Sequence, residues 1–75
     1  MEFEYTGTIY IDVDDIFEKC REHNSIDTDD IYKEVNDYII SLDDSIYYCV
    51  EGWMIDKVVT EIKKRVDKEL NSWYN

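Results

Sequence analysis

The sequence predicts a small α+β domain in which a long C-terminal helix packs on a small antiparallel sheet, in the order β-α-α-β-α. Two observations lead to this class. Apolar residues alternate with polar ones in two short segments, and they recur at spacings of three and four in three other segments. The chain of 75 residues is 44% hydrophobic and has no proline, which favours a folded chain despite a formal charge of −11. This length predicts a single domain, 1–75.

The first strand is expected in residues 3–13, where apolar and polar side chains alternate. Gly7 marks either a bulge or, with Thr6, the turn of a short hairpin. Because the alternation keeps its phase across Gly7, we prefer one long strand. The second strand is expected in residues 46–51, before Gly52. There Ile46, Tyr48 and Val50 alternate with Tyr47, Cys49 and Glu51.

Three helices are expected in the rest of the chain. The first begins at Asp12 or Asp14 and ends near His23, and the second runs from about residue 28 to about residue 42. The third runs from about residue 53 to residue 73 and is on the order of 30 Å long. The apolar stripes expected to be buried are Ile16, Phe17 and Cys20; Ile31, Val35, Tyr38, Ile39 and Leu42; and Ile55, Val58, Val59, Ile62, Val66, Leu70 and Trp73.

Acidic residues are concentrated in the first 51 positions. Fifteen of the nineteen Asp and Glu residues lie there against three bases, which gives this part a formal charge of −12. The last 24 residues hold four acids and five bases, which gives them a charge of +1. A charge separation of this size limits the surfaces that the protein can bind.

One acidic phrase is repeated in this part of the chain. It occurs as Ile11-Asp12-Val13-Asp14-Asp15-Ile16-Phe17, then as Ile26-Asp27-Thr28-Asp29-Asp30-Ile31-Tyr32, and more weakly as Leu42-Asp43-Asp44-Ser45-Ile46-Tyr47. Asp before a helix and in its first turn is typical of a helix start, because it accepts from free backbone N–H groups and favours the helix dipole. Capping leaves a surplus of acids: Glu2, Glu4, Glu18, Glu22, Glu34, Asp37 and Glu51.

No metal or cofactor site is expected. A calcium loop of the EF-hand type needs glycine at its sixth position and an acid at its twelfth. Counted from Asp12, these positions hold Phe17 and His23, and the copy that begins at Asp27 fails at the same two positions. The chain has no glycine-rich loop that could hold a phosphate.

No catalytic site is expected either, and the predicted protein is not an enzyme. The single histidine, His23, stands in no catalytic motif. Cys20 and Cys49 are expected to be reduced packing residues, because disulfides are rare in intracellular proteins. Two cysteines are also too few for a four-ligand zinc site.

The sequence predicts a cytoplasmic protein that contacts neither membrane nor nucleic acid directly. It has no segment of roughly 20 apolar residues and no signal peptide pattern at its start. Phosphates would repel the acidic part of the chain. The bases of the last predicted helix are expected to form ion pairs, or to attract the acidic part of the same molecule or of a second copy. These bases are Lys57, Lys63, Lys64, Arg65 and Lys68.

The expected partner is a protein with a basic, nucleic-acid-binding surface. Carboxylates one helical turn apart lie roughly 5–6 Å from each other, which is comparable with the spacing of phosphates along a strand. Exposed tyrosines among Tyr10, Tyr32, Tyr47 and Tyr74 would add contacts of the kind that anchor interfaces. The predicted partner-binding residues are Asp12, Asp14, Asp15, Asp27, Asp29, Asp30, Asp43 and Asp44.

In composition the chain resembles the small acidic inhibitors encoded by phages, which include anti-CRISPR proteins and other DNA mimics. The resemblance lies in its small size, its lack of proline, its seven tyrosines and its acidic stretch from Glu2 to Glu51. It implies an inhibitor that blocks a CRISPR effector in the cytoplasm of an infected bacterium. The basic C-terminal helix departs from a uniformly acidic mimic. The alternative is a homo-oligomeric module, such as a homodimer, or an adaptor, whose acidity serves solubility.

Overall fold

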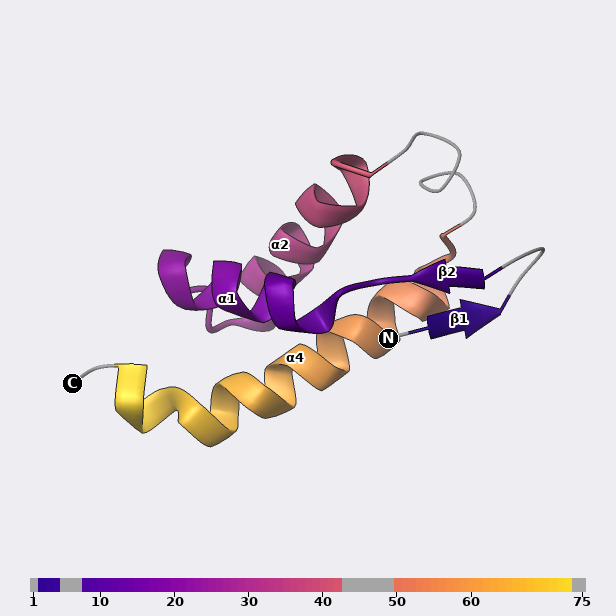
Figure 1. The fold of residues 1–75 in the computed structure, drawn as a ribbon. Coiled ribbons are helices and arrows are strands. Elements are labelled where there is room, and N and C mark those ends of the chain that lie inside the picture. Colours follow the sequence, from indigo (N-terminus) through magenta and orange to yellow (C-terminus); the bar gives the residue numbers. More distant parts are fainter. Residues whose placement is uncertain (1, 5–7, 43–49, 74–75) are drawn as a thin grey trace.

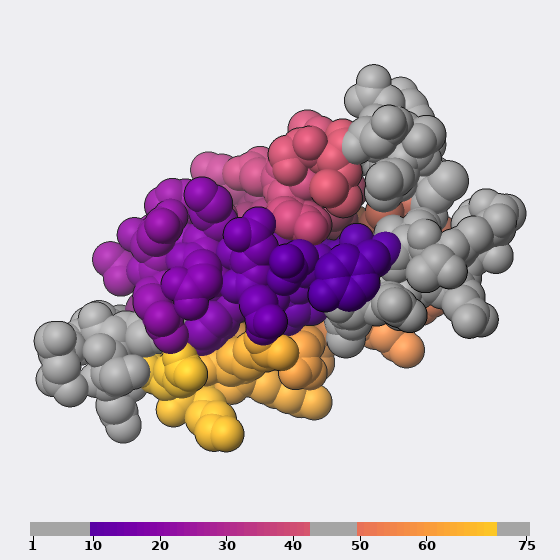
Figure 2. Space-filling view, in the orientation of Figure 1, coloured from indigo at the N-terminus to yellow at the C-terminus, as the bar shows by residue number. Residues whose placement is uncertain are grey.

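In the part of the chain that the structure describes, three helices form the body of the molecule. The computed structural model describes residues 2–4, 8–42 and 50–73. Within these ranges lie helices α1 (Val13–His23), α2 (Thr28–Ile40) and α4 (Gly52–Trp73). α1 and α2 lie on one side of the longer α4, and all three pairs of helices pack against each other (Figure 1). The surfaces of α1 and α4 are in direct contact (Figure 2).

A short hairpin precedes the helices. Strands β1 (Glu2–Glu4) and β2 (Thr8–Tyr10) pair antiparallel, with Phe3 opposite Ile9. The preferred single strand over 3–13 is therefore wrong, and the alternative of a short hairpin is correct. Pairing within the hairpin gives backbone groups partners that a lone strand would lack. Residues 5–7 lie outside the described part of the chain.

The α+β class is also wrong, because the fold is helical. Ile11 and Val13 enter the core as the lead into α1 and not as members of a strand. Within the described ranges, the three-residue strands pair only with each other, and the amphipathic helices bury one another's apolar stripes without a larger sheet. Val50 and Glu51 are not in a strand, and the rest of the predicted second strand lies outside the described residues.

The ends of α1 follow from its sequence. The Asp12 side chain accepts a hydrogen bond from the backbone N–H of Asp15 at 3.1 Å, which caps the start of the helix. At the other end Asn24 adopts the left-handed conformation with φ 53°, which asparagine tolerates better than most residues. Ser25 then donates its backbone N–H to the Cys20 carbonyl at 2.9 Å. The predicted bounds of this helix are confirmed.

α2 begins after Asp27, as predicted, and ends at Ile40, two residues before the predicted Leu42. The Ser41 hydroxyl donates to the Tyr38 carbonyl at 2.5 Å, so a side chain satisfies one of the last carbonyls. The third predicted helix corresponds to α4, with bounds that agree within one residue.

Among the described residues, thirteen buried apolar side chains form the core, and nearly all of them come from the three helices. Most of the predicted stripe residues whose side chains are described are buried, whereas Tyr38, Leu42, Ile55 and Leu70 are only half-buried, and the side chain of Trp73 lies outside the described part. The buried row of α4 starts at Met54, which sequence reasoning missed, and not at Ile55. The buried set is Ile11, Val13, Ile16, Phe17, Cys20, Ile31, Val35, Ile39, Met54, Val58, Val59, Ile62 and Val66. Among the described residues, no helix has the length and apolar character needed to cross a membrane.

Candidate interaction surface

The predicted contact residues lie at helix starts. Asp12 caps α1, and Asp14 and Asp15 occupy its first turn. Asp27 precedes α2, and Asp29 and Asp30 occupy the first turn there. Both strong copies therefore stand at helix starts, as expected, but the expected side-chain cap bond is present only at Asp12 and not at Asp27. Asp43 and Asp44 lie outside the described residues.

These two groups of aspartates do not form one patch. The first group lies at the N-terminal end of α1, and the second follows its C-terminal end. The 11 residues of α1 separate them by roughly 16 Å at 1.5 Å per residue. Each group therefore has to be judged by its own surroundings.

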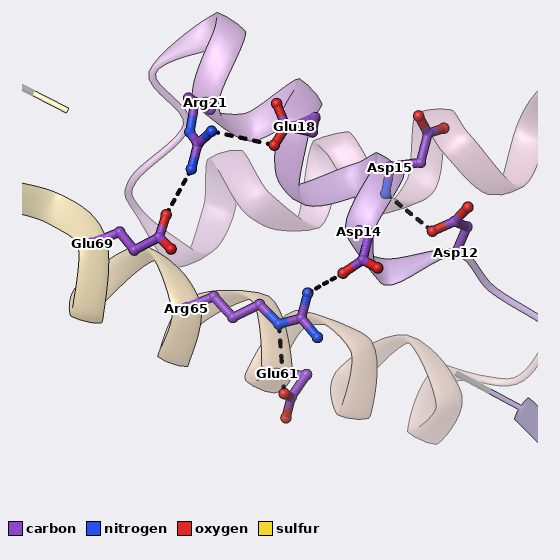
Figure 3. A network of polar contacts seen from close by, with 8 residues as sticks. All are labelled: Asp12, Asp14, Asp15, Glu18, Arg21, Glu61, Arg65 and Glu69. Carbon is purple, nitrogen blue, oxygen red and sulfur yellow. Dashed lines mark hydrogen bonds and ion pairs between the residues drawn. The ribbon is translucent and has the colours of Figure 1, made fainter. Parts of the chain in front are cut away.

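The first group is largely engaged within the molecule. Asp14, which is exposed, forms an ion pair with Arg65 of α4, and Arg65 Nε lies 3.7 Å from Glu61 Oε1 (Figure 3). The hydrogen bond to Asp14 raises the pKa of Arg65 further above its usual range. An exposed pair of this kind contributes about 0–1 kcal/mol, but it compensates the charge of Asp14 locally.

A second arginine links the same two helices, and this one lies on α1 and pairs with an acid of α4. Arg21 of α1 donates from Nη2 to Glu69 Oε2 of α4 at 2.7 Å, and its Nη1 lies 3.3 Å from Glu18 Oε1 (Figure 3). Lys63 of α4 pairs with Asp67 at 3.0 Å. The expectation that bases of the last helix form ion pairs and attract the acidic part of the same molecule is confirmed for Arg65.

The second group belongs to a longer row of acids on α2. Residues 27–40 contain five acids and one base, Lys33. Four of the acids recur at spacings of three and four and so lie along one side of the helix. We call this set the carboxylate row: Asp27, Asp30, Glu34 and Asp37. Among the described residues, Asp27, Asp30 and Asp37 form no ion pair, and all three are exposed.

The carboxylate row borders two hollows of the surface. One lies between α1 and α2 and has a volume of about 320 Å³. It is lined by Asp15, Ile16, Lys19, His23, Glu34, Asp37, Tyr38 and Ser41, and we call it the α1–α2 groove. The other lies beside it and shares His23, Glu34 and Asp37, with Asp30 and Lys33. Three members of the carboxylate row, Asp30, Glu34 and Asp37, therefore lie at a concave part of the surface, and Asp30 and Asp37 are exposed there.

As far as the described side chains go, Glu34 is the one member of the row that forms hydrogen bonds through its carboxylate. Its Oε1 lies 2.7 Å from His23 Nδ1 and accepts a hydrogen bond from the Ser25 hydroxyl at 3.2 Å. His23 and Glu34 both line the α1–α2 groove, so the contact between them lies in its wall. Tyr38, which lines the groove, accepts a hydrogen bond on its hydroxyl from the Asp12 N–H at 3.2 Å.

Sequence reasoning named Asp27 and Asp30 as contact residues but missed Glu34 and Asp37. It treated these two only as acids beyond the needs of capping. Their spacing from Asp27 and Asp30 would have placed them on the same side of the helix. The repeated phrase covers the start of α2, whereas Glu34 and Asp37 lie beyond it in the sequence.

Cys20, predicted to be a packing residue, is fully buried and forms no disulfide. Burial and the nearby Glu34 carboxylate raise the pKa of its thiol to about 11, so it stays protonated near neutral pH. Cys49 lies outside the described residues.

In the described part of the chain, no three His, Cys, Asp or Glu side chains are grouped as metal ligands. Comparisons with protein-family models, curated proteins and solved structures find no match.

Proposed function

We propose that this chain is a non-enzymatic inhibitor that binds the basic surface of a nucleic-acid-binding protein through the carboxylate row of α2. The observation that carries the proposal is the excess of five acids over one base in residues 27–40, with Asp27, Asp30 and Asp37 exposed and unpaired among the described residues. A surface with this uncompensated charge attracts cationic partners and steers their approach.

The spacing of the row suits a surface that binds phosphates. Neighbouring carboxylates on one side of a helix lie roughly 5–6 Å apart. From Asp27 to Asp37 the row extends roughly 15 Å at 1.5 Å per residue. A rigid row of this length can occupy part of a groove that otherwise holds the backbone of DNA or RNA.

The rest of the molecule is less suited to this contact. Asp12 is engaged as a helix cap, and Asp14 is compensated by Arg65. α4 carries five bases and four acids and would not attract a basic surface. The contact surface is therefore centred on α2 and the groove beside it. A CRISPR effector is the first partner to test, because of the compositional resemblance to small acidic phage inhibitors.

The test compares two variants with the same change in charge. The row variant carries Asp27→Asn, Asp30→Asn and Asp37→Asn. The control variant carries Glu51→Gln, Asp56→Asn and Asp67→Asn, which remove three exposed acids away from the row and from the groove beside it. Each immobilised protein is exposed to a CRISPR effector loaded with its guide RNA, and then to a bacterial lysate.

We expect bound proteins to be displaced by competing DNA or RNA. The row variant should bind roughly tenfold or more weakly, since three charge contacts of up to 1 kcal/mol each are removed. The control variant should bind nearly as well as the original chain. Equal binding by the two variants, with circular dichroism showing both folded, would contradict the proposal.

The second candidate is an oligomeric or adaptor module, and the exposure of apolar side chains favours it. Tyr10 and Ile40 are both 59% exposed, and Trp53 is 45% exposed. Aromatic side chains of this kind are common anchors of protein interfaces. In this case association would depend on apolar surface and would persist at high salt.

A further inference from the structure

We infer that the α1–α2 groove anchors an arginine side chain of the partner protein. This inference rests on the proposed function and adds to it the chemistry of the group that is recognised. The carboxylate row explains attraction to any basic surface. The groove has features that distinguish one kind of cation from another.

The groove has both apolar and acidic lining. Tyr38, which is half-buried, contributes most of the apolar surface that a ligand can reach, since Ile16 is only 1% exposed, and Asp15 of α1 and Asp37 of α2 contribute carboxylates. The volume of about 320 Å³ is large enough for one long side chain. A cation with an aliphatic stem can therefore bury the stem in the groove while its charged end reaches the carboxylates.

The charge of the groove is negative. It is lined by three carboxylates, Asp15, Glu34 and Asp37, and by one lysine, Lys19. Lys19 Nζ lies 3.8 Å from Glu22, which is not among the residues that line the groove. Glu34 is already held by His23 and Ser25. Asp15 and Asp37 form no ion pair among the described residues, so they are the groups available to a cation.

Arginine fits these features better than lysine. Its guanidinium group is planar and weakly hydrated, stacks on aromatic rings, and presents several N–H donors in different directions. One guanidinium can therefore contact the Tyr38 ring while donating to Asp15 and Asp37 on two different helices. The ammonium group of lysine is compact and strongly hydrated, and it gains less from an apolar lining.

The groove is also held in shape before a ligand binds. The hydrogen bond from the Asp12 N–H to the Tyr38 hydroxyl fixes one side at 3.2 Å. The contacts of His23 and Ser25 with Glu34, at 2.7 and 3.2 Å, hold the side chain of Glu34 in the lining of the groove. A site that is already ordered loses less conformational entropy when it binds.

The experiment uses two blocked peptides of equal length and charge, hexa-arginine and hexa-lysine. Each is titrated into the ¹⁵N-labelled chain at low salt, and amide shifts are followed by NMR. We expect hexa-arginine to bind several-fold more tightly, with its largest shifts at Asp15, Asp37 and Tyr38. Equal affinity of the two peptides, with shifts confined to the first turn of α2, would overturn the inference and leave the proposed function standing.

Three variants test which residues determine the preference for hexa-arginine. Asp37→Asn should weaken hexa-arginine binding several-fold, whereas Asp56→Asn on α4, with the same charge change, should leave it nearly unchanged. Tyr38→Leu should bring the arginine-to-lysine affinity ratio close to one. Asp37 is exposed, so its variant tests the groove even where Tyr38→Leu fails to fold. If neither peptide shifts any amide of α2, the proposed function itself fails.

Discussion

At the scale of single residues, Cys20 makes the stability of the fold depend on pH. Its side chain is fully buried, and the pKa of its thiol is raised from 9.0 to about 11, chiefly by burial and also by Glu34. In the unfolded chain the thiol ionises near its ordinary pKa. Between these two values the folded state keeps a proton that the unfolded state has lost.

The folded state should therefore lose stability as pH rises from about 9 to about 11, by up to about 1.4 kcal/mol per pH unit from this group. Below pH 9 the thiol is protonated in both states and contributes no pH dependence. Urea unfolding at several pH values measures the slope for the original chain and for Cys20→Ala. The variant should be less stable throughout, because of the cavity, but its stability should fall less steeply. Identical slopes would contradict this assignment.

At the scale of elements, the two copies of the acidic phrase differ in what they do. The Asp12 side chain caps α1 through a hydrogen bond to the Asp15 N–H, whereas Asp27 makes no side-chain cap bond at the start of α2. Both aspartates favour the dipole of the helix that follows, so this contribution is shared. The two aspartates therefore differ in the side-chain cap bond, which Asp12 forms and Asp27 does not.

Asp12→Ala should therefore cost about 1 kcal/mol of the free energy of unfolding, and Asp27→Ala clearly less. Asp12→Asn should recover most of the loss, because the asparagine side chain also accepts the Asp15 N–H. Urea unfolding of the three variants under the same conditions gives the comparison. Equal losses for Asp12→Ala and Asp27→Ala would show that the cap bond has no effect.

Elements defined by local chemistry could be predicted from the sequence, and those defined by distant partners could not. The helix starts at Asp12 and Asp27 and the end at Asn24 follow from capping and turn preferences within a few residues. The alternation in residues 3–13 is equally local, but whether it forms one strand or a hairpin depends on which segment pairs with it. An apolar residue such as Ile11 fits a strand, where it would alternate with polar residues, and it fits equally well a buried position just before a helix.

The same distinction applies to the candidate surface. The acids of the carboxylate row were visible in the sequence, and their spacing on α2 needs only helical geometry. That bases of the last helix attract the acidic part of the molecule was expected, but the particular pairing of Arg65 with Asp14 could not be predicted, because the two residues lie 51 positions apart in the chain. The α1–α2 groove likewise depends on how two helices pack, which no local pattern specifies.

At the scale of the whole molecule, charge acts on stability and on binding in opposite directions. The chain carries nineteen acids and eight Lys and Arg residues, for a formal charge of −11. Salt screens this repulsion more than it weakens the few exposed ion pairs, so added salt should stabilise the fold. A complex with a basic partner depends on the same charges across an interface, so added salt should weaken it.

Thermal unfolding and sedimentation at about 50 mM and about 500 mM NaCl test both effects, because the Debye length falls severalfold over this range. We expect the Tm to rise by a few degrees while the complex with a basic partner dissociates. An oligomer held by apolar surface, as in the alternative function, would keep its sedimentation coefficient at the higher salt. A rising Tm together with an unchanged complex would mean that the acids serve solubility, and would contradict the role proposed for the carboxylate row.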